Sequence, residues 1–130
     1  MKSPQTELVE LLHTALKKDF KGLTIGELDS DNSIAMQPTG GSKDDTYLDQ
    51  SEQRYLTLLI LCKNKSMAAA YDTTCRIANT AAALSPLPAP KGCQWIKNEV
   101  ETDPQEVGLV GGYYIYSCVI HMHYLLRRKK

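Results

Sequence analysis

The sequence predicts an α+β fold, a mainly antiparallel sheet of about four to five strands with two helices packed on one face. Three observations support this prediction. Residues 113–126 (YYIYSCVIHMHYLL) form an apolar, β-branched and aromatic run that is typical of a central strand. Apolar side chains recur at helical spacing near the N-terminus and again in residues 67–84. The expected element order is α-β-β-β-α-β-β, in a single domain of residues 1–130.

The first helix begins after Ser3, which is a good N-cap residue and is followed by Pro4. Its apolar face is formed by Leu8, Leu11, Leu12, Ala15 and Leu16. Residues 23–28 and 33–37 are expected to be two short strands of a hairpin, joined by a polar turn at 29–32.

Residues 38–53 are polar, contain the pair Gly40-Gly41, and are expected to form a flexible loop. The pair Tyr47-Leu48 is the only apolar content of this stretch. Two interpretations stay open: these residues anchor a partner when the loop becomes ordered, or the loop is a plain connection between strands.

Residues 54–63 predict an interior strand, because both of its faces are apolar. Ser66 is expected to cap the second helix, and the proline-rich residues 85–90 to end it. A further strand is expected at 91–101, with Trp95 in the core. It leads into an acidic stretch, bent at Pro104, that predicts a solvated edge or a charged interface: Glu99, Glu101, Asp103 and Glu106.

The composition restricts the function only weakly. Fifteen basic and fifteen acidic residues give no net charge, which is unusual for a general nucleic-acid binder. The four cysteines form no CxxC pair and predict free thiols in a reducing compartment. No signal-type segment or membrane-spanning run is apparent, so a soluble protein made in a cytoplasm is expected.

No arrangement of residues predicts an enzyme, a cofactor or a native metal. There is no phosphate-binding glycine loop, no GxSxG and no HExxH motif. His121 and His123 would share one face of a strand, a geometry that can bind zinc or copper. A third ligand is not apparent nearby, because Cys118 would point to the opposite face.

Nearly the whole chain resembles the tail terminator proteins of long-tailed bacteriophages, also called tail-completion or minor capsid proteins. The likeness lies in GLTIGELDSDNSIAMQPTGG after the first helix, QRYLTLLILCKN before an alanine-rich helix, and YYIYSCVIHMHYLL in the closing strand. The resemblance implies a homo-oligomeric ring, expected to be a hexamer, at the head–tail junction of a virion. Such a ring caps the tail tube, stops its polymerisation and contacts the head–tail connector protein. DNA passes through its lumen without specific binding, and no membrane is involved.

A ring subunit needs charged edges that meet head to tail and loops that become ordered on assembly. The candidate interface residues are therefore those of the polar loop, the acidic stretch and the basic tail at 127–130: Lys43, Asp44, Asp45, Tyr47, Leu48, Asp49, Glu99, Glu101, Asp103, Glu106, Arg127 and Arg128. The alternative is a small nucleic-acid-binding α+β domain that stacks bases on its tyrosine-rich strand and contacts phosphates with the basic tail.

Overall fold

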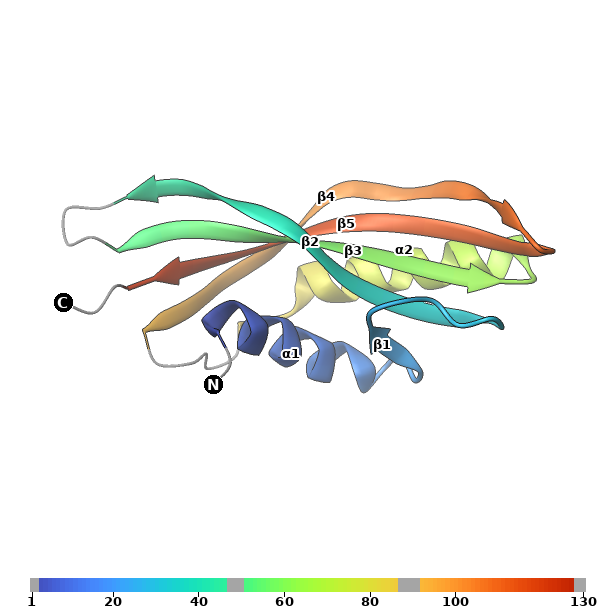
Figure 1. Ribbon diagram of the computed structural model, residues 1–130, viewed down its shortest axis with the longest axis horizontal. Coiled ribbons are helices and arrows are strands. Elements are labelled where there is room, and N and C mark those ends of the chain that lie inside the picture. Colours follow the sequence, from blue (N-terminus) through green and yellow to red (C-terminus); the bar gives the residue numbers. More distant parts are fainter. Residues whose placement is uncertain (1–2, 47–50, 87–91, 128–130) are drawn as a thin grey trace.

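The computed structural model describes residues 3–46, 51–86 and 92–127, with the backbone alone for residues 41–46 (Figure 1). Its elements follow the expected order: α1 (Pro4–Lys17), β1 (Leu23–Ile25), β2 (Ser33–Thr46), β3 (Glu52–Asn64), α2 (Met67–Ala83), β4 (Cys93–Val110) and β5 (Tyr113–Leu126). The predicted α+β class and the order α-β-β-β-α-β-β are confirmed.

Both helices begin where the sequence predicts. The hydroxyl of Ser3 accepts a hydrogen bond from the backbone N–H of Thr6 at 3.1 Å, and Pro4 takes the first helical position. Ser66 caps α2 in the same way, accepting from the N–H of Ala69 at 3.2 Å. Each cap satisfies one of the backbone donors that a helix leaves unpaired at its N-terminus.

The five strands form one sheet in the order β1-β2-β3-β5-β4. β5 lies between β3 and β4 and pairs antiparallel with both, as expected for a central strand. Gly111 and Gly112 join β4 to β5, with φ of 58° and 84°. Two consecutive positive φ angles are what a tight two-residue hairpin turn requires, and glycine adopts them without strain.

The expected hairpin of residues 23–28 and 33–37 is wrong. β1 has three residues and pairs parallel with β2, with Leu23 opposite Ile34. Two parallel neighbouring strands normally need a long crossover connection. Because β1 has only three residues, the seven residues 26–32 are enough to lead the chain back to the start of β2. The side chain of Lys63 holds this connection by donating to the carbonyl oxygens of Asp29 and Ser30, at 2.9 and 3.2 Å.

The flexible loop expected at residues 38–53 is also corrected. β2 continues to Thr46, and its backbone pairs with β3 from Pro38 opposite Leu58 to Thr46 opposite Glu52. β3 supplies hydrogen-bond partners for the backbone N–H and C=O groups of this segment. The polar residues therefore form one arm of a long hairpin. A register shift between Pro38 and Gly40 marks a bulge in this arm. Tyr47, Leu48 and Asp49 lie outside the described residues.

The strand expected at 91–101 is longer than the sequence predicts, because β4 continues through the acidic stretch and past Pro104 to Val110. Proline has no N–H to donate, and an edge strand tolerates that because one side of its backbone has no partner strand. The pairing of β4 with β5 adjusts by register shifts near this proline. One shift, between Thr102 and Gln105, spans it, and another follows it between Glu106 and Gly108.

The core lies between the helices and one face of the sheet. Alternate residues of β3 and β5 face it, together with the apolar faces of both helices; its fully buried members include Leu8, Leu12, Leu16, Leu58, Ile60, Ile77, Ala81, Ile120 and Met122. Met67 and Tyr71 have the helical spacing that predicts a place on the apolar face of α2, and this prediction is wrong, because each is 50% exposed. In the part of the chain that the structure describes, no helix covers the other face of the sheet, here called the helix-free face.

All four cysteines are free thiols, as expected. Burial raises the pKa of Cys62 and of Cys93 to about 11, and that of Cys118 to about 12. Among the described residues, no helix is long and apolar enough to cross a membrane.

Candidate functional site

Strand alternation places two histidines together on the helix-free face. Ile120, Met122 and Tyr124 of β5 point into the core, where each is at most 1% exposed. His121 and His123 therefore point to the opposite face, because successive side chains of a strand alternate. The expectation that both imidazoles share one strand face is confirmed, and their ring centroids are 6.2 Å apart.

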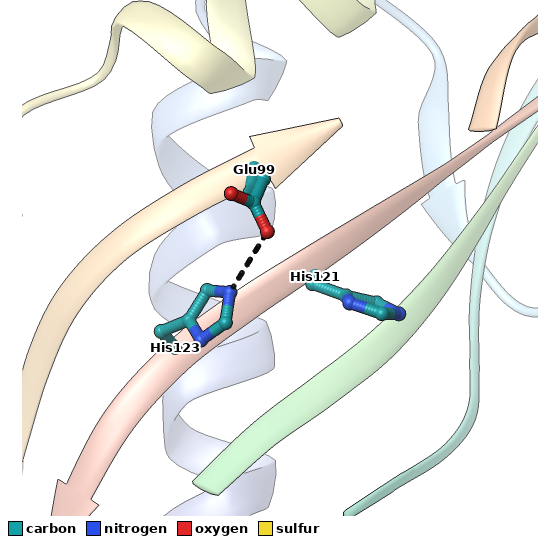
Figure 2. A group of neighbouring side chains, drawn as sticks. All are labelled: Glu99, His121 and His123. Atoms are coloured by element: carbon teal, nitrogen blue, oxygen red, sulfur yellow. Dashed lines mark hydrogen bonds and ion pairs between the residues drawn. The ribbon is translucent and has the colours of Figure 1, made fainter. Parts of the chain in front are cut away.

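Glu99 of β4 joins this pair from the neighbouring strand (Figure 2). It lies opposite His121 in the β4–β5 ladder, and its Oε1 is 3.4 Å from Nε2 of His123. Each of the three residues offers one ligand atom, and these atoms all lie within 4.8 Å of one another. The cluster of Glu99, His121 and His123 is here called the His–Glu site.

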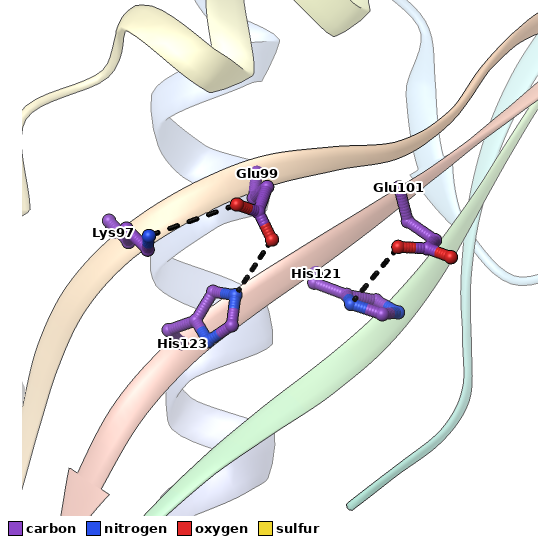
Figure 3. Close-up of polar contacts among 5 residues, drawn as sticks. All are labelled: Lys97, Glu99, Glu101, His121 and His123. Carbon is purple, nitrogen blue, oxygen red and sulfur yellow. Dashed lines mark hydrogen bonds and ion pairs between the residues drawn. The ribbon is translucent and has the colours of Figure 1, made fainter. Parts of the chain in front are cut away.

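Two further charged side chains flank the His–Glu site (Figure 3). Nζ of Lys97 is 3.8 Å from the second carboxylate oxygen of Glu99, and a carboxylate oxygen of Glu101 is 3.8 Å from Nδ1 of His121. The two carboxylates and the single ammonium give the region a negative balance while the imidazoles are neutral. This balance favours a cation over an anion as a ligand.

Tyr55 of β3 borders the His–Glu site on the side away from β4. Its ring stacks on His121 with centroids 4.2 Å apart and an interplanar angle of 26°, and it lies 5.8 Å from the ring of His123. The histidine side chains are only 16% and 11% exposed, whereas the Glu99 side chain is 52% exposed. The imidazoles are thus held within the surface, and the site opens to solvent on its carboxylate side.

Sequence reasoning identified the two histidines and missed their third partner. Glu99 stood among the candidate interface residues, as did Glu101, and the structure brings both to the histidines instead. The feature of the sequence that could have indicated this partner is the β4–β5 hairpin, because its pairing places carboxylates of β4 opposite residues of β5. Its register depends on bulges that residue type does not indicate.

The other predicted interface residues lie apart from this site. Asp103 and Glu106 are exposed on β4, and Arg127 is exposed just beyond β5, where its N–H donates to the carbonyl of Gly92 at 2.8 Å. Glu106 lies opposite Tyr116, so eleven positions along β5, roughly 35 Å, separate the acidic group from Arg127. For the remaining candidates, Lys43, Asp44 and Asp45 have their backbone in β2, and Arg128 lies outside the described residues.

Two tyrosines of β5, Tyr116 and Tyr124, contribute to packing against the helices. Tyr124 is 1% exposed, and its hydroxyl accepts a hydrogen bond from Nε2 of Gln5 in α1 at 3.2 Å. Tyr116 meets the ring of Tyr71 of α2 edge to face, with centroids 5.6 Å apart. A nucleic-acid base cannot stack on the buried ring of Tyr124. This residue therefore cannot take part in the base stacking that the nucleic-acid-binding alternative requires.

Besides Met67 and Tyr71 of α2, two further apolar surfaces are uncovered within the described chain. The first, here called the hairpin tip, consists of Val107, Leu109 and Val110, which are 58%, 60% and 60% exposed at the end of β4. The second is a groove between α1 and the β1–β2 edge, here called the α1 groove. Its apolar lining is Val9, Ile25, Pro38 and Leu56.

The fold and these surfaces define a class: a small α+β protein whose single sheet has one helix-covered face and one face bearing a His–Glu site. No protein-family model matches the chain, and no curated protein matches it significantly. The function is therefore argued from the chain's own residues and surfaces.

Proposed function

We propose that this chain is a non-enzymatic phage virion assembly protein. It caps the tail tube as a homo-oligomeric ring, stops tube polymerisation and forms the interface to the head connector. The proposal combines the resemblance in the sequence with one structural observation that carries it, the exposed hairpin tip.

The hairpin tip has the character of a surface that another chain covers. Its three aliphatic side chains are each more than half exposed and lie within four residues of an edge strand. Scattered apolar residues are normal on a protein surface, but a cluster on an open strand edge favours association. Burying these side chains in an interface would remove apolar area from water, which stabilises the assembly.

The partner that we propose for the hairpin tip is the α1 groove of a second copy. A chain cannot fill its own groove, because Leu56 lies opposite Met122 and Val110 lies opposite Tyr113. These positions are nine residues apart along β5, roughly 30 Å. Both surfaces are apolar, and each is uncovered in the described chain.

A contact between two different surfaces has a direct consequence for assembly. In such a heterologous contact, a growing row of subunits always has one free tip at one end and one free groove at the other. The row closes into a ring when the rotation from one subunit to the next divides a full turn. This is the geometry that a tube cap needs. The resemblance supplies the expected number of subunits, six.

The charges of the chain suit the same arrangement. Asp103 and Glu106 lie on the edge strand, far from Arg127 of their own chain. Acidic groups of one subunit that meet the basic tail of the next would fix the register of the contact more than they add to its affinity. The zero net charge fits a ring through which DNA passes, because a strongly basic lumen would retain the phosphates.

The test is the oligomeric state of the full chain, followed by its binding to tail tubes. Light scattering over a concentration series should show growth from monomer to a closed oligomer, and negative-stain images should show rings. Tail tubes assembled from the tube protein should stop growing when the chain is added. A protein that stays monomeric at high concentration and leaves tube length unchanged would refute the proposal.

A further inference from the structure

We propose that Glu99, His121 and His123 bind one divalent first-row transition-metal ion, with Zn²⁺ or Cu²⁺ preferred, on the helix-free face of the sheet. This site is independent of the ring contacts proposed above, because it uses neither the hairpin tip nor the α1 groove. It goes beyond the sequence prediction, which found no third ligand for the two histidines.

The ligand set decides the class of metal. Two imidazole nitrogens and one carboxylate oxygen suit zinc, copper and nickel, whereas magnesium and calcium prefer ligand sets made of oxygen alone. Two histidines and one glutamate also form a known three-ligand set for zinc, with the fourth position left for water. The exposed side of the Glu99 carboxylate leaves room for that water.

The geometry needs only a small contraction. Ligand atoms that now lie within 4.8 Å of one another would have to approach to about 3.3 Å around a tetrahedral ion with bonds of about 2.0–2.1 Å. Oε1 of Glu99 and Nε2 of His123 are already 3.4 Å apart. The remaining adjustment falls to side-chain torsions, while the strands stay in place.

The two histidine ligands are held in position before a metal arrives. They lie two residues apart on a strand that is paired on both sides, which fixes their backbone positions. The stacked ring of Tyr55 restricts the rotation of His121. Ligands that are ordered in advance lose less conformational entropy on binding, which favours affinity.

Glu101 and Lys97 take supporting roles. The carboxylate of Glu101 is 3.8 Å from Nδ1 of His121 and adds negative charge beside the site, which favours a bound cation. The ammonium of Lys97 competes with a metal for the Glu99 carboxylate, but the Lys97 side chain is 58% exposed and can turn toward solvent. Removing this ammonium should therefore strengthen metal binding.

The experiment uses the full chain without a histidine tag, first freed of metal with a chelator. Calorimetric titration with Zn²⁺ and with Cu²⁺ should give one ion per chain. Changing His123→Gln or Glu99→Gln should weaken binding at least about tenfold, since even residues outside the ligand shell commonly contribute that much. Lys97→Ala should keep the stoichiometry and tighten binding.

Two matched control variants distinguish binding at the His–Glu site from nonspecific metal binding. His13→Gln removes the one remaining histidine of the chain, which lies in α1, and Glu106→Gln removes an exposed carboxylate elsewhere on β4. Neither change should alter the affinity. Equal weakening by His13→Gln and His123→Gln would overturn the proposal.

A spectroscopic measurement on the unaltered chain avoids any doubt about folding of the variants. Imidazole nitrogen shifts in NMR should move for His121 and His123 on addition of Zn²⁺ and stay constant for His13. Unchanged shifts of His121 and His123 at millimolar Zn²⁺, or the absence of binding heat with either metal, would refute the site.

Discussion

The indole nitrogen of Trp95 donates a hydrogen bond to the side-chain oxygen of Asn98 at 3.1 Å. Asn98 in turn donates to the carbonyl oxygen of Ala81, in the last turn of α2, at 2.9 Å. Trp95 and Asn98 are 3% and 7% exposed. One buried amide thus joins the start of β4 to the end of α2, and the stability of this junction can be tested.

Trp95→Ala should destabilise the protein by roughly 3–5 kcal/mol, because it removes a large buried side chain and leaves a cavity. Urea-induced unfolding measures the change. Gln94→Ala, at the exposed neighbouring position, should stay within about 0.5 kcal/mol of the unaltered protein. A near-neutral result for Trp95→Ala would contradict its place in the core.

Asn98→Ala should cost about 1–3 kcal/mol, because it leaves the buried Trp95 indole without a hydrogen bond. The Ala81 carbonyl loses one of its two donors but keeps the N–H of Leu84, at 3.3 Å. A double-mutant cycle isolates the hydrogen bond of the indole. In a Trp95→Phe background the indole donor is already absent, so Asn98→Ala should cost less, with a coupling energy of about 0.5–3 kcal/mol. Additive changes would argue against the hydrogen bond between the two side chains.

The parts of the fold predicted correctly are those that local sequence determines. The caps Ser3 and Ser66 and the inward face of β5 follow from residue type and from periods of 3.6 and 2. The parts predicted wrongly depend on distant partners. Residues 38–46 are polar and glycine-containing, and their backbone is extended because β3 offers a ladder to pair with. Nothing within the segment itself indicates this.

The third member of the His–Glu site could not be predicted from the sequence either, because it depends on the register between β4 and β5. Without irregularities, the hairpin that pairs Val110 with Tyr113 would place Thr102 opposite His121. The register shifts along β4 place Glu99 there instead. The sequence shows two histidines on one face, but the third ligand depends on bulges that form around Pro104 and its neighbours.

The stability of the protein should fall above about pH 9. Burial raises the pKa of Cys62 to about 11 and that of Cys118 to about 12, whereas a thiol in the unfolded chain ionises near pH 8.5. Below pH 8.5 both states hold the proton, so the full stability is present. As the pH rises toward 11, only the unfolded thiols ionise, and unfolding becomes more favourable.

Urea unfolding at pH 7, 9 and 10 measures this alkaline loss. A Cys62→Ala, Cys118→Ala variant should be less stable at pH 7, because it creates cavities, but should lose less free energy of unfolding between pH 7 and pH 10. The same loss in both proteins would show that other groups cause the alkaline instability.

The basic tail provides a test of the proposed ring. Arg127→Glu with Arg128→Glu should leave folding intact, because Arg127 is exposed just beyond β5 and its hydrogen bond to Gly92 is made by the backbone, which the substitution keeps. The oligomer should weaken, and the effect should shrink as salt screens the charges. Lys18→Glu with Lys21→Glu makes the same charge change at exposed positions elsewhere and should not affect assembly. Unchanged assembly of the tail variant would remove the tail from the interface.

The contact between hairpin tip and α1 groove makes the sharpest prediction, because its two sides can be broken separately. Leu109→Asp places a charge on the tip, and Ile25→Asp places one in the groove; these residues are 60% and 43% exposed, so both variants should fold. Each variant alone should remain monomeric. Mixed in equal amounts they should form a dimer and no larger species, because the tip of the groove variant is intact and so is the groove of the tip variant.

A contact between two hairpin tips would behave differently. In that case the groove variant alone would still assemble, and mixing would restore nothing. Met67→Asp is the matched control, since Met67 is an apolar residue of α2 that is 50% exposed and belongs to neither surface. Sedimentation velocity of the three variants, separately and in pairs, therefore distinguishes a head-to-tail ring from a symmetric dimer.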